Sequence, residues 1–223
     1  MKVELIKYTD SPDDICAFAA SNCVRKNLNK SDLECMNYSA LRSALKSGHD
    51  SVAEHAIFTF LISDVSRITE TQLVRHRMAS YAIQSGRYCT RNPTITVLPE
   101  TVSAVIDEDL EKMIFDYEDV LGAIDVKLES KGVPKEDRRY FYPQGLSTRI
   151  VVTMNGRELR HFLSLRMCNR AQWEIRYMAR AMYEEVRKVA PVLMEGAGPG
   201  CMTGNCKEGH PCDNPYINEI GGI

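Results

Sequence analysis

The amino-acid sequence predicts one α+β domain, a sheet flanked by helices. Three observations indicate this class. Short runs of β-branched and aromatic residues alternate with longer segments of helical apolar spacing, so the chain contains both strands and helices. These segments follow no regular βαβ rhythm, which favours α+β over the alternative, a parallel sheet with crossover helices. No repeat or linker precedes Gly196, so we expect a domain over residues 1–195 and a Gly/Pro/Cys-rich tail over 196–223.

The first two helices are predicted from capping residues. Ser11 followed by Pro12 is typical of a helix start, and a short apolar face follows. That face consists of Ile15, Phe18 and Ala19. Ser31 and Glu34 form a capping-box pattern before apolar residues at helical spacing, and Gly48 can supply a left-handed residue at the end. We therefore expect a second helix between Ser31 and Gly48.

The middle of the chain predicts a strand and two helices. Residues 55–62 are rich in β-branched and aromatic side chains, which is typical of a strand. Ser63 or Asp64 then caps a helix that leads into a polar cluster. Apolar residues between 110 and 128 keep helical spacing and predict a long amphipathic helix that ends at Gly132.

The last third predicts a strand followed by two helices. Residues 150–153 form the strand, and Asn155-Gly156 turns the chain into the first helix. The second helix runs from about residue 171 to 189 and stops before Pro191.

Composition excludes several classes of protein. With 223 residues, of which 44% are hydrophobic, the chain can bury a sizeable core. The net charge of -2 provides no global basic field for nucleic acid or an anionic membrane. The sequence contains neither an apolar run long enough to span a bilayer nor a signal-peptide pattern at its N-terminus. We therefore expect a cytoplasmic protein without a nucleic-acid or membrane partner.

Arginine and lysine are distributed unevenly. Lysine is absent between Lys46 and Lys112, and the stretch from Arg138 to Arg187 holds ten arginines and no lysine. Between them, the acidic segment 107–137 carries most of the compensating charge. Arginine without lysine favours planar, bidentate recognition of phosphate or carboxylate. The alternative is that these arginines pair with acids at subunit contacts.

The densest polar cluster spans residues 75–88. If a helix ends near Arg77 and the rest is a loop, guanidinium, hydroxyl and imidazole groups converge beside Gly86, where backbone can approach a ligand. Such a loop suits a planar ligand that bears phosphate, although a loop braced by arginine pairs is the alternative. The arginines beside His76 are expected to lower its pKa and keep the imidazole neutral. No carboxylate or cysteine stands at ligand spacing, so no metal is expected here.

At this cluster the sequence resembles a known family. Arg75-His76-Arg77, then seven residues, then Ser85 matches the RHR-x7-S signature of the flavin-dependent thymidylate synthases, the ThyX family. Further matching blocks are Gly48-His49 with Glu54-His55, the strand with Phe58 and Phe60, Asn155-Gly156-Arg157 through Arg166, and Ala171 through Ile175. The resemblance covers roughly residues 40 to 180 in compatible order.

The resemblance implies an enzyme that makes dTMP from dUMP in de novo dTMP biosynthesis. In this family methylenetetrahydrofolate is the one-carbon donor, FAD the redox cofactor and NADPH the usual reductant. Members are homotetramers whose active sites draw residues from several subunits. Their fold is α+β and not a Rossmann domain, which agrees with the absence of a GxGxxG pattern in this chain.

The resemblance also assigns residues to ligands by motif position. The expected FAD contacts are Ser51, Arg75, His76, Arg77, Asn155, Arg157 and His161. The expected dUMP contacts are Gln72, Arg75, Gln84, Ser85, Gly86, Arg87, Arg139 and Arg166. Among these, Ser85, Arg87 and Arg139 take the phosphate and Arg166 the base. Arg166 and His49 are the expected catalytic residues, Arg166 by stabilising charge on the base and His49 at the flavin and folate side.

Two positions depart from the family pattern. Many relatives have Glu or Gln where this chain has Ile83, so the adjacent Gln84 takes over that polar contact or the contact is lost. His161 stands where relatives have Asn. A nucleophilic role for Ser85 is disfavoured, because an alcohol needs a neighbouring base and its neighbours are arginines.

The cysteines fall into two groups. Five scattered ones are most simply small buried residues: Cys16, Cys23, Cys35, Cys89 and Cys168. The tail holds Cys201, Cys206, His210 and Cys212, whose spacing is not that of a usual zinc finger. A structural metal, a redox-labile or disordered tail and packed thiols all remain open for the tail.

Two rival functions also remain open. One is a nucleotide- or RNA-binding module that stacks bases on Tyr81, Tyr88, Tyr140 and Tyr142. The other is a flavoprotein that shares the fold and catalyses a different reaction. The first predicts no flavin, and the second predicts no dUMP binding.

Overall fold

The computed structural model describes residues 1–88, 96–210, 212, 215 and 216. The chain divides into two compact units that are interleaved along the sequence. Unit 1 holds residues 1–2, 62–73 and 82–150, and unit 2 holds residues 3–61, 74–81 and 151–223. No helix in the described part of the chain is long and apolar enough to cross a membrane.

Four strands form one sheet in the order β1-β2-β4-β3. Their bounds are β1 Lys2–Tyr8, β2 Ile57–Ser66, β3 Ala79–Ile83 and β4 Ser147–Asn155. The hydroxyls of Thr59 and Thr153 lie 3.0 Å apart, and the N–H of Arg67 donates to the carbonyl oxygen of Leu146. Residue numbers thus rise along β2 as they fall along β4, so the central pair is antiparallel.

Alternate residues of the two central strands form the buried face of the sheet. Phe58, Phe60 and Ile62 on β2 are fully buried, as is Ile150 on β4. This period of two is what a pleated strand requires when one face packs on a core. The strands predicted from residues 55–62 and 150–153 are confirmed and are longer than expected. The edge strands β1 and β3 were not predicted.

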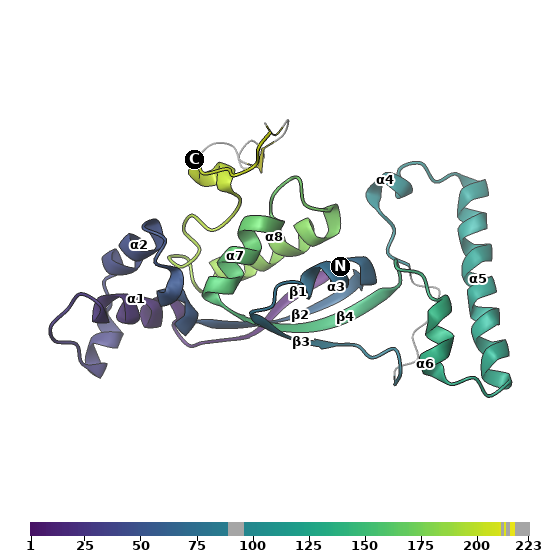
Figure 1. The fold of residues 1–223 in the computed structure, drawn as a ribbon, viewed down its shortest axis with the longest axis horizontal. Coiled ribbons are helices and arrows are strands. Elements are labelled where there is room, and N and C mark those ends of the chain that lie inside the picture. The colour runs from purple at the N-terminus through teal and green to yellow at the C-terminus, as the bar shows by residue number, and fades with distance from the viewer. Residues whose placement is uncertain (89–95, 211, 213–214, 217–223) are drawn as a thin grey trace. The chain divides into compact units, whose positions relative to one another are not determined.

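In unit 2, four helices accompany the sheet: α1 Pro12–Asn22, α2 Ser39–Lys46, α7 Gly156–Arg166 and α8 Trp173–Arg187. α7 and α8 lie side by side on one face of the sheet (Figure 1). α7 begins where the side chain of Asn155 accepts the N–H of Glu158 at 2.9 Å. α8 begins where the side chain of Gln172 accepts the N–H groups of Glu174 and Ile175. Both predicted helices are confirmed, each with a side-chain cap.

The predictions for the N-terminal helices are partly wrong. The side chain of Ser11 makes no capping bond, and the buried face of α1 holds Cys16, Ala17 and Ala20. The expected face, one of Ile15, Phe18 and Ala19, is only partly buried.

The second predicted helix is divided into two. Asn29 and Asp32, instead of Ser31 and Glu34, form the capping box of a short 3-10 helix. The backbone of Met36 is extended, and the side chain of Asn37 accepts the N–H of Ser39, where α2 begins. Short polar side chains that bond to nearby backbone interrupt a helix in this way.

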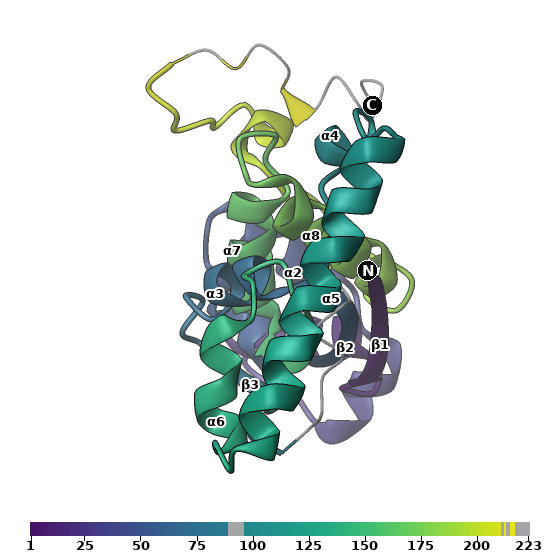
Figure 2. The same cartoon turned by 90° about the vertical axis from the view of Figure 1, so that its right-hand side faces the viewer.

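In unit 1, four helices are described: α3 Arg67–Leu73, α4 Glu100–Ser103, α5 Glu108–Ser130 and α6 Lys135–Arg138. The long helix α5 is confirmed, with Asp107 as its cap. α3 is capped by Ser66, whose hydroxyl accepts the N–H of Thr69, because β2 continues through the two residues predicted as caps. The side chain of Arg138 is buried and donates to Glu129 at 2.9 Å, which holds α6 beside α5 (Figure 2).

Candidate active site

The local folding of α7 places several predicted site residues in unit 2. Asn155 caps the helix, Arg157 lies in its first turn and Arg166 in its last. The exposed guanidinium of Arg157 pairs with Glu54 at 2.6 Å. Glu54 belongs to a 3-10 helix over Asp50–His55, which also carries Ser51. This ion pair therefore joins α7, through Arg157, to the 3-10 helix that carries the expected FAD residue Ser51.

His76 is the most constrained of the predicted residues. It is only 5% exposed, although Arg75 and Arg77 on either side of it are exposed. Its Nδ1 lies 3.1 Å from a carboxylate oxygen of Glu158, and the Nε–H of Arg166 donates to its Nε2 at 3.1 Å. Its carbonyl oxygen accepts the hydroxyl of Tyr81 at 2.7 Å.

The pKa of His76 is lowered, as expected, but chiefly for a different reason. Burial is the largest cause, and the positive charge of Arg166 acts in the same direction. The hydrogen bond to Glu158 acts in the opposite direction. The prediction that Arg75 and Arg77 cause this shift is therefore wrong: the residues that matter lie on α7. The predicted neutral imidazole agrees with this direction.

This lowered pKa predicts a loss of stability in acid. Below pH 6.5 the unfolded chain takes up a proton on this histidine while the folded chain does not, so the free energy of unfolding falls as pH falls. One such group costs at most about 1.4 kcal/mol per pH unit, until the folded pKa is reached. We expect urea unfolding at pH 7.5 and 5.5 to show a smaller difference between the two pH values for His76→Gln than for the unchanged protein. An equal pH dependence in both would contradict this origin.

Arg166 lines a cavity of about 610 Å³. Burial lowers the pKa of its guanidinium, and the charge of Arg75 acts in the same direction. His161 also lines this cavity, together with tail residues that include Gly198, Cys201, Cys206 and Tyr216. The structure thus brings one predicted base-binding residue and one predicted flavin-binding residue to the same cavity.

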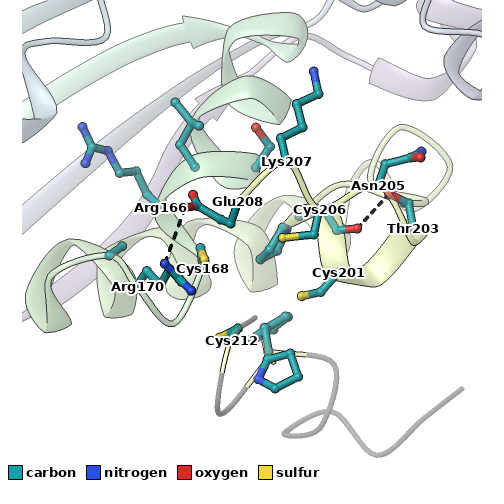
Figure 3. Close-up of a pocket in the computed structure, with 18 of the residues that line it drawn as sticks. Arg166, Cys168, Arg170, Cys201, Thr203, Asn205, Cys206, Lys207, Glu208 and Cys212 are labelled. Carbon is teal, nitrogen blue, oxygen red and sulfur yellow. Dashed lines mark hydrogen bonds and ion pairs between the residues drawn. The ribbon is translucent and has the colours of Figure 1, made fainter. Parts of the chain in front are cut away.

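Four thiols lie around this cavity: Cys168, Cys201, Cys206 and Cys212 (Figure 3). None is in a disulfide. Arg170 holds the tail by donating to the carbonyl oxygen of His210 at 2.9 Å. Within the described ranges, no three His, Cys, Asp or Glu side chains are grouped as a metal site.

The scattered cysteines were predicted to be buried, and this holds for only part of them. Cys16 is fully buried, but Cys23 and Cys35 are exposed and Cys168 is partly exposed. Cys23 directly follows α1, and Cys35 ends a 3-10 helix without buried residues, so neither faces a core. Cys89 lies outside the described residues.

In unit 1 the structure brings together the residues predicted for the dUMP phosphate. Ser85 and Arg87 share a short turn, in which the N–H of Arg87 donates to the Ser85 hydroxyl at 3.1 Å. Gly86 lies against Arg139: a Cβ added to the glycine would stand 3.5 Å from the arginine side chain, which is an ordinary van der Waals distance. Gly86 and Arg139 line a cavity of about 340 Å³ with Tyr140.

The remaining predicted dUMP residues lie in both units. Gln72, on α3, and Gln84 belong to unit 1, whereas Arg75 and Arg166 belong to unit 2. Gln84 donates its backbone N–H to the carbonyl oxygen of Arg149 and is partly buried.

The alternative prediction, that the arginines of the polar cluster brace a loop by pairing with acids, holds for some of these arginines and not for others. Arg87 pairs with Glu136 at 2.7 Å, and both side chains are about half exposed. Arg75 and Arg77 have no ion-pair partner among the residues that the structure describes. An exposed pair contributes little to stability, so a phosphate can displace the carboxylate of Glu136.

A second cavity in unit 2, of about 740 Å³, is lined by His49 and Ser51. Small side chains of α2, among them Ala40, Ser43 and Ala44, also line it. His49 is exposed, and its backbone N–H donates to the carbonyl oxygen of Ala44. The structure therefore brings His49 together with one predicted FAD residue.

Two features of the site were not predicted. The segment after Arg77 is not a loop throughout, since Ser80 and Tyr81 lie in β3. Glu158, the buried partner of His76, is not among the residues that the sequence predicts for the site. Its signal in the sequence is an acidic residue three positions after the cap Asn155, where a carboxylate is favourable at a helix N-terminus.

Sequence comparison finds that the chain is similar to proteins that share one name, flavin-dependent thymidylate synthase. The family model "Thymidylate synthase complementing protein" matches residues 4–192. A protein of Geobacter sulfurreducens named flavin-dependent thymidylate synthase is 42% identical over 220 residues, which is 94% of this chain and 92% of that protein. A Pyrococcus horikoshii protein of the same name is 40% identical over 93% of this chain and 90% of its own length.

Solved structures show the same fold. ThyX from Helicobacter pylori, complexed with FAD and dUMP, has a TM-score of 0.70 at 24% identity and covers 89% of this chain and 100% of that chain. The UMP/dUMP methylase PolB from Streptomyces cacaoi, bound with 5-Br dUMP, has a TM-score of 0.69 at 23% identity, over 87% of this chain and 93% of that one. These matches confirm the predicted α+β fold class.

Proposed function

Because the chain belongs to the family of thymidylate synthase complementing proteins, the flavin-dependent thymidylate synthases, we propose that it converts dUMP to dTMP with methylenetetrahydrofolate as carbon donor, FAD as redox cofactor and NADPH as reductant. The observation that supports this most directly is the buried His76, which bonds to Arg166 and stands between two exposed arginines. These residues belong to the RHR-x7-S signature and to the second matching block of the family. The proposed enzyme acts in the cytoplasm.

The residues present fit FAD by their chemistry. A dinucleotide brings two phosphates, and the exposed guanidinium groups of Arg75 and Arg77 can donate to them in bidentate fashion. The predicted contacts Asn155 and His161 offer hydrogen bonds that suit a heterocycle, whereas both ring nitrogens of His76 are already bonded, to Glu158 and Arg166. When bound, FAD supplies a redox-active ring that takes reducing equivalents from a nicotinamide.

For dUMP, we propose that the phosphate binds the turn of Ser85, Gly86 and Arg87 together with Arg139. Two arginines and a hydroxyl give a dianion strong, charge-assisted hydrogen bonds. Gly86 and Arg139 line the same cavity of about 340 Å³. Gln72, Gln84 and Arg75 are the proposed additional contacts to the nucleotide.

Arg166 is the proposed catalytic cation. Carbon 5 of uracil is a poor nucleophile, so attack on a one-carbon unit requires negative charge to develop on the base oxygens. A guanidinium already held at those oxygens stabilises this charge without reorganising during the reaction. His49 is the second proposed catalytic residue, at the flavin and folate side, in the cavity that it shares with Ser51.

Ser85→Ala is expected to weaken substrate binding without stopping the chemistry. The hydroxyl is proposed as one of several phosphate contacts, so its loss removes about 1–2 kcal/mol of binding and raises KM for dUMP roughly 5- to 30-fold. The kcat should stay within a few-fold of the unchanged enzyme. Abolished turnover with intact dUMP affinity would indicate a nucleophilic serine and contradict this assignment.

We also propose that the enzyme is a homotetramer with shared active sites. α5 was predicted as an amphipathic helix, yet Met113 and Val120 of its apolar spacing are more than half exposed in the single chain, as are Phe115 and Val126. Large exposed apolar side chains at this density are typical of protein interfaces. Sedimentation equilibrium of the full chain is expected to give four times the mass of one chain, and a monomer would contradict the proposal.

The proposed reaction can be tested by measuring the release of the hydrogen at carbon 5 of dUMP, which the methyl group replaces. Attack by carbon 5 of dUMP on the one-carbon unit must release the hydrogen at that carbon, so dUMP tritiated there should lose tritium to water as dTMP forms. We expect release only when methylenetetrahydrofolate, FAD and NADPH are all present. Salt-sensitive oligonucleotide binding without flavin would instead support a binding module. A flavoprotein that does not bind dUMP would support a different reaction.

A further inference from the structure

A buried carboxylate stands behind the arginine proposed for catalysis. Glu158 is 8% exposed and His76 is 5% exposed, and the imidazole lies between Glu158 and Arg166 at 3.1 Å from each. The position of Glu158 is fixed because its own N–H donates to the Asn155 side chain. The rings of Phe162 and His76 meet in a T-shaped arrangement, with their centroids 4.9 Å apart. The imidazole is thus held on several sides.

The direction of the two hydrogen bonds follows from the groups that make them. A guanidinium has only donors, so the Nε–H of Arg166 requires a lone pair on Nε2 of His76. In a neutral imidazole the hydrogen then resides on Nδ1. The carboxylate of Glu158 has only acceptors when ionised, and it faces that nitrogen. Glu158 therefore selects the one neutral tautomer that can accept from Arg166.

Without Glu158, this selection would be lost. The opposite tautomer carries its hydrogen on Nε2 and places two donors, N–H against N–H, at the contact with Arg166. A protonated imidazole would do the same and would add repulsion between two cations. In either form Arg166 would lose its fixed contact and sample other rotamers.

The contact uses only the Nε–H of Arg166, which leaves the terminal nitrogens of its guanidinium for a ligand. The side chain is partly buried and lines the cavity of about 610 Å³ described above. An arginine that is fixed through Nε keeps its outer edge in one orientation, which is the arrangement needed for a preorganised cation.

We propose that Glu158 is a positioning residue, which acts through His76 to hold the guanidinium of Arg166 against the nucleotide base. This rests on the proposed function, in that Arg166 is taken to stabilise charge on the base of dUMP. The role goes beyond holding the fold together, since it depends on which imidazole nitrogen carries the hydrogen.

The kinetic test compares three variants of the full-length enzyme loaded with FAD. Glu158→Ala is expected to lower kcat roughly 10- to 100-fold, the cost of a misplaced catalytic group. KM for dUMP and FAD content should stay within a few-fold. Glu158→Gln should restore most of the activity, because its amide oxygen can still accept from Nδ1–H. Glu174→Ala is the matched control: it also removes a buried carboxylate from the first turn of a helix in unit 2, and kcat should be unchanged.

A spectroscopic test needs no turnover. In protein labelled with ¹⁵N in its histidine rings, protonated and non-protonated nitrogens have well-separated shifts, and His76→Gln identifies the signals of His76. We expect the hydrogen on Nδ1 in the unchanged protein, and on Nε2 or on both nitrogens in Glu158→Ala. A hydrogen on Nε2 in the unchanged protein would overturn the proposal. So would equal loss of kcat in Glu158→Ala and Glu174→Ala.

The two tests separate this inference from the proposed function. If the unchanged enzyme forms no dTMP while His76 carries its hydrogen on Nδ1, the proposed function fails and the tautomer selection stands. If dTMP forms and Glu158→Ala keeps the full kcat, the positioning role fails and the proposed function stands.

Discussion

Arg166→Ala is expected to lower dUMP-dependent turnover by about 10²- to 10³-fold, the usual cost of losing one preorganised group that stabilises developing charge. FAD content should be unchanged, because the proposed flavin contacts lie on other residues. The loss should appear in kcat more than in KM, since the guanidinium acts mainly on charge that is absent from the ground state.

Arg170→Ala provides the control for this variant. Arg170 lines the same cavity as Arg166, but it contacts the tail through the carbonyl oxygen of His210 and the carboxylate of Glu208. Its loss should leave kcat within a few-fold. If Arg166→Ala released FAD instead, Arg166 would be assigned to flavin binding and not to the base.

Asp13→Ala is expected to have the largest effect on stability. The carboxylate of Asp13, in the first turn of α1, accepts the N–H groups of Val192 and Leu193 at 2.8 Å each. All three residues are buried, so the alanine variant leaves two buried donors without a partner. At about 1–3 kcal/mol for each, the free energy of unfolding should fall by roughly 2–6 kcal/mol.

Urea unfolding of three variants tests this assignment. Asp14→Ala, one residue along, removes the bond that Asp14 accepts from the hydroxyl of Tyr38 and should cost about 1 kcal/mol. Asp13→Asn keeps one acceptor oxygen and should lie between the two alanine variants. Equal losses in the free energy of unfolding for Asp13→Ala and Asp14→Ala would contradict this assignment. The hydrogen bonds between Asp13 and the segment after α8 would then not be a main determinant of stability.

The parts of the fold that the sequence predicts are those with a local signal. β2 and β4 have apolar or β-branched runs, and α7 begins at an Asn-Gly pair that caps it. β1 escaped prediction because it mixes lysine and glutamate with its apolar residues and holds no fully buried one. β3 lies inside the polar cluster, where pairing with β4 overrides local preference.

In the candidate site, too, the features with a local sequence signal were predicted and those that depend on distant residues were not. Motif order alone predicts Arg75, His76 and Ser85 as site residues, since they are close in sequence, and this assignment stays a prediction. The partners of His76 lie 82 and 90 residues further along the chain, on a helix whose packing no local pattern specifies. For this reason the direction of its pKa shift was predicted correctly while its cause was not.

The most direct test of the central claim is the visible absorption spectrum of the purified protein, recorded before and after anaerobic NADPH, with and without dUMP. We expect the spectrum of an oxidised flavin that bleaches with NADPH, at a rate that dUMP changes, because flavin, reductant and nucleotide share one site in this account. A colourless protein that also fails to take up added FAD would contradict the assignment to flavin-dependent dTMP synthesis.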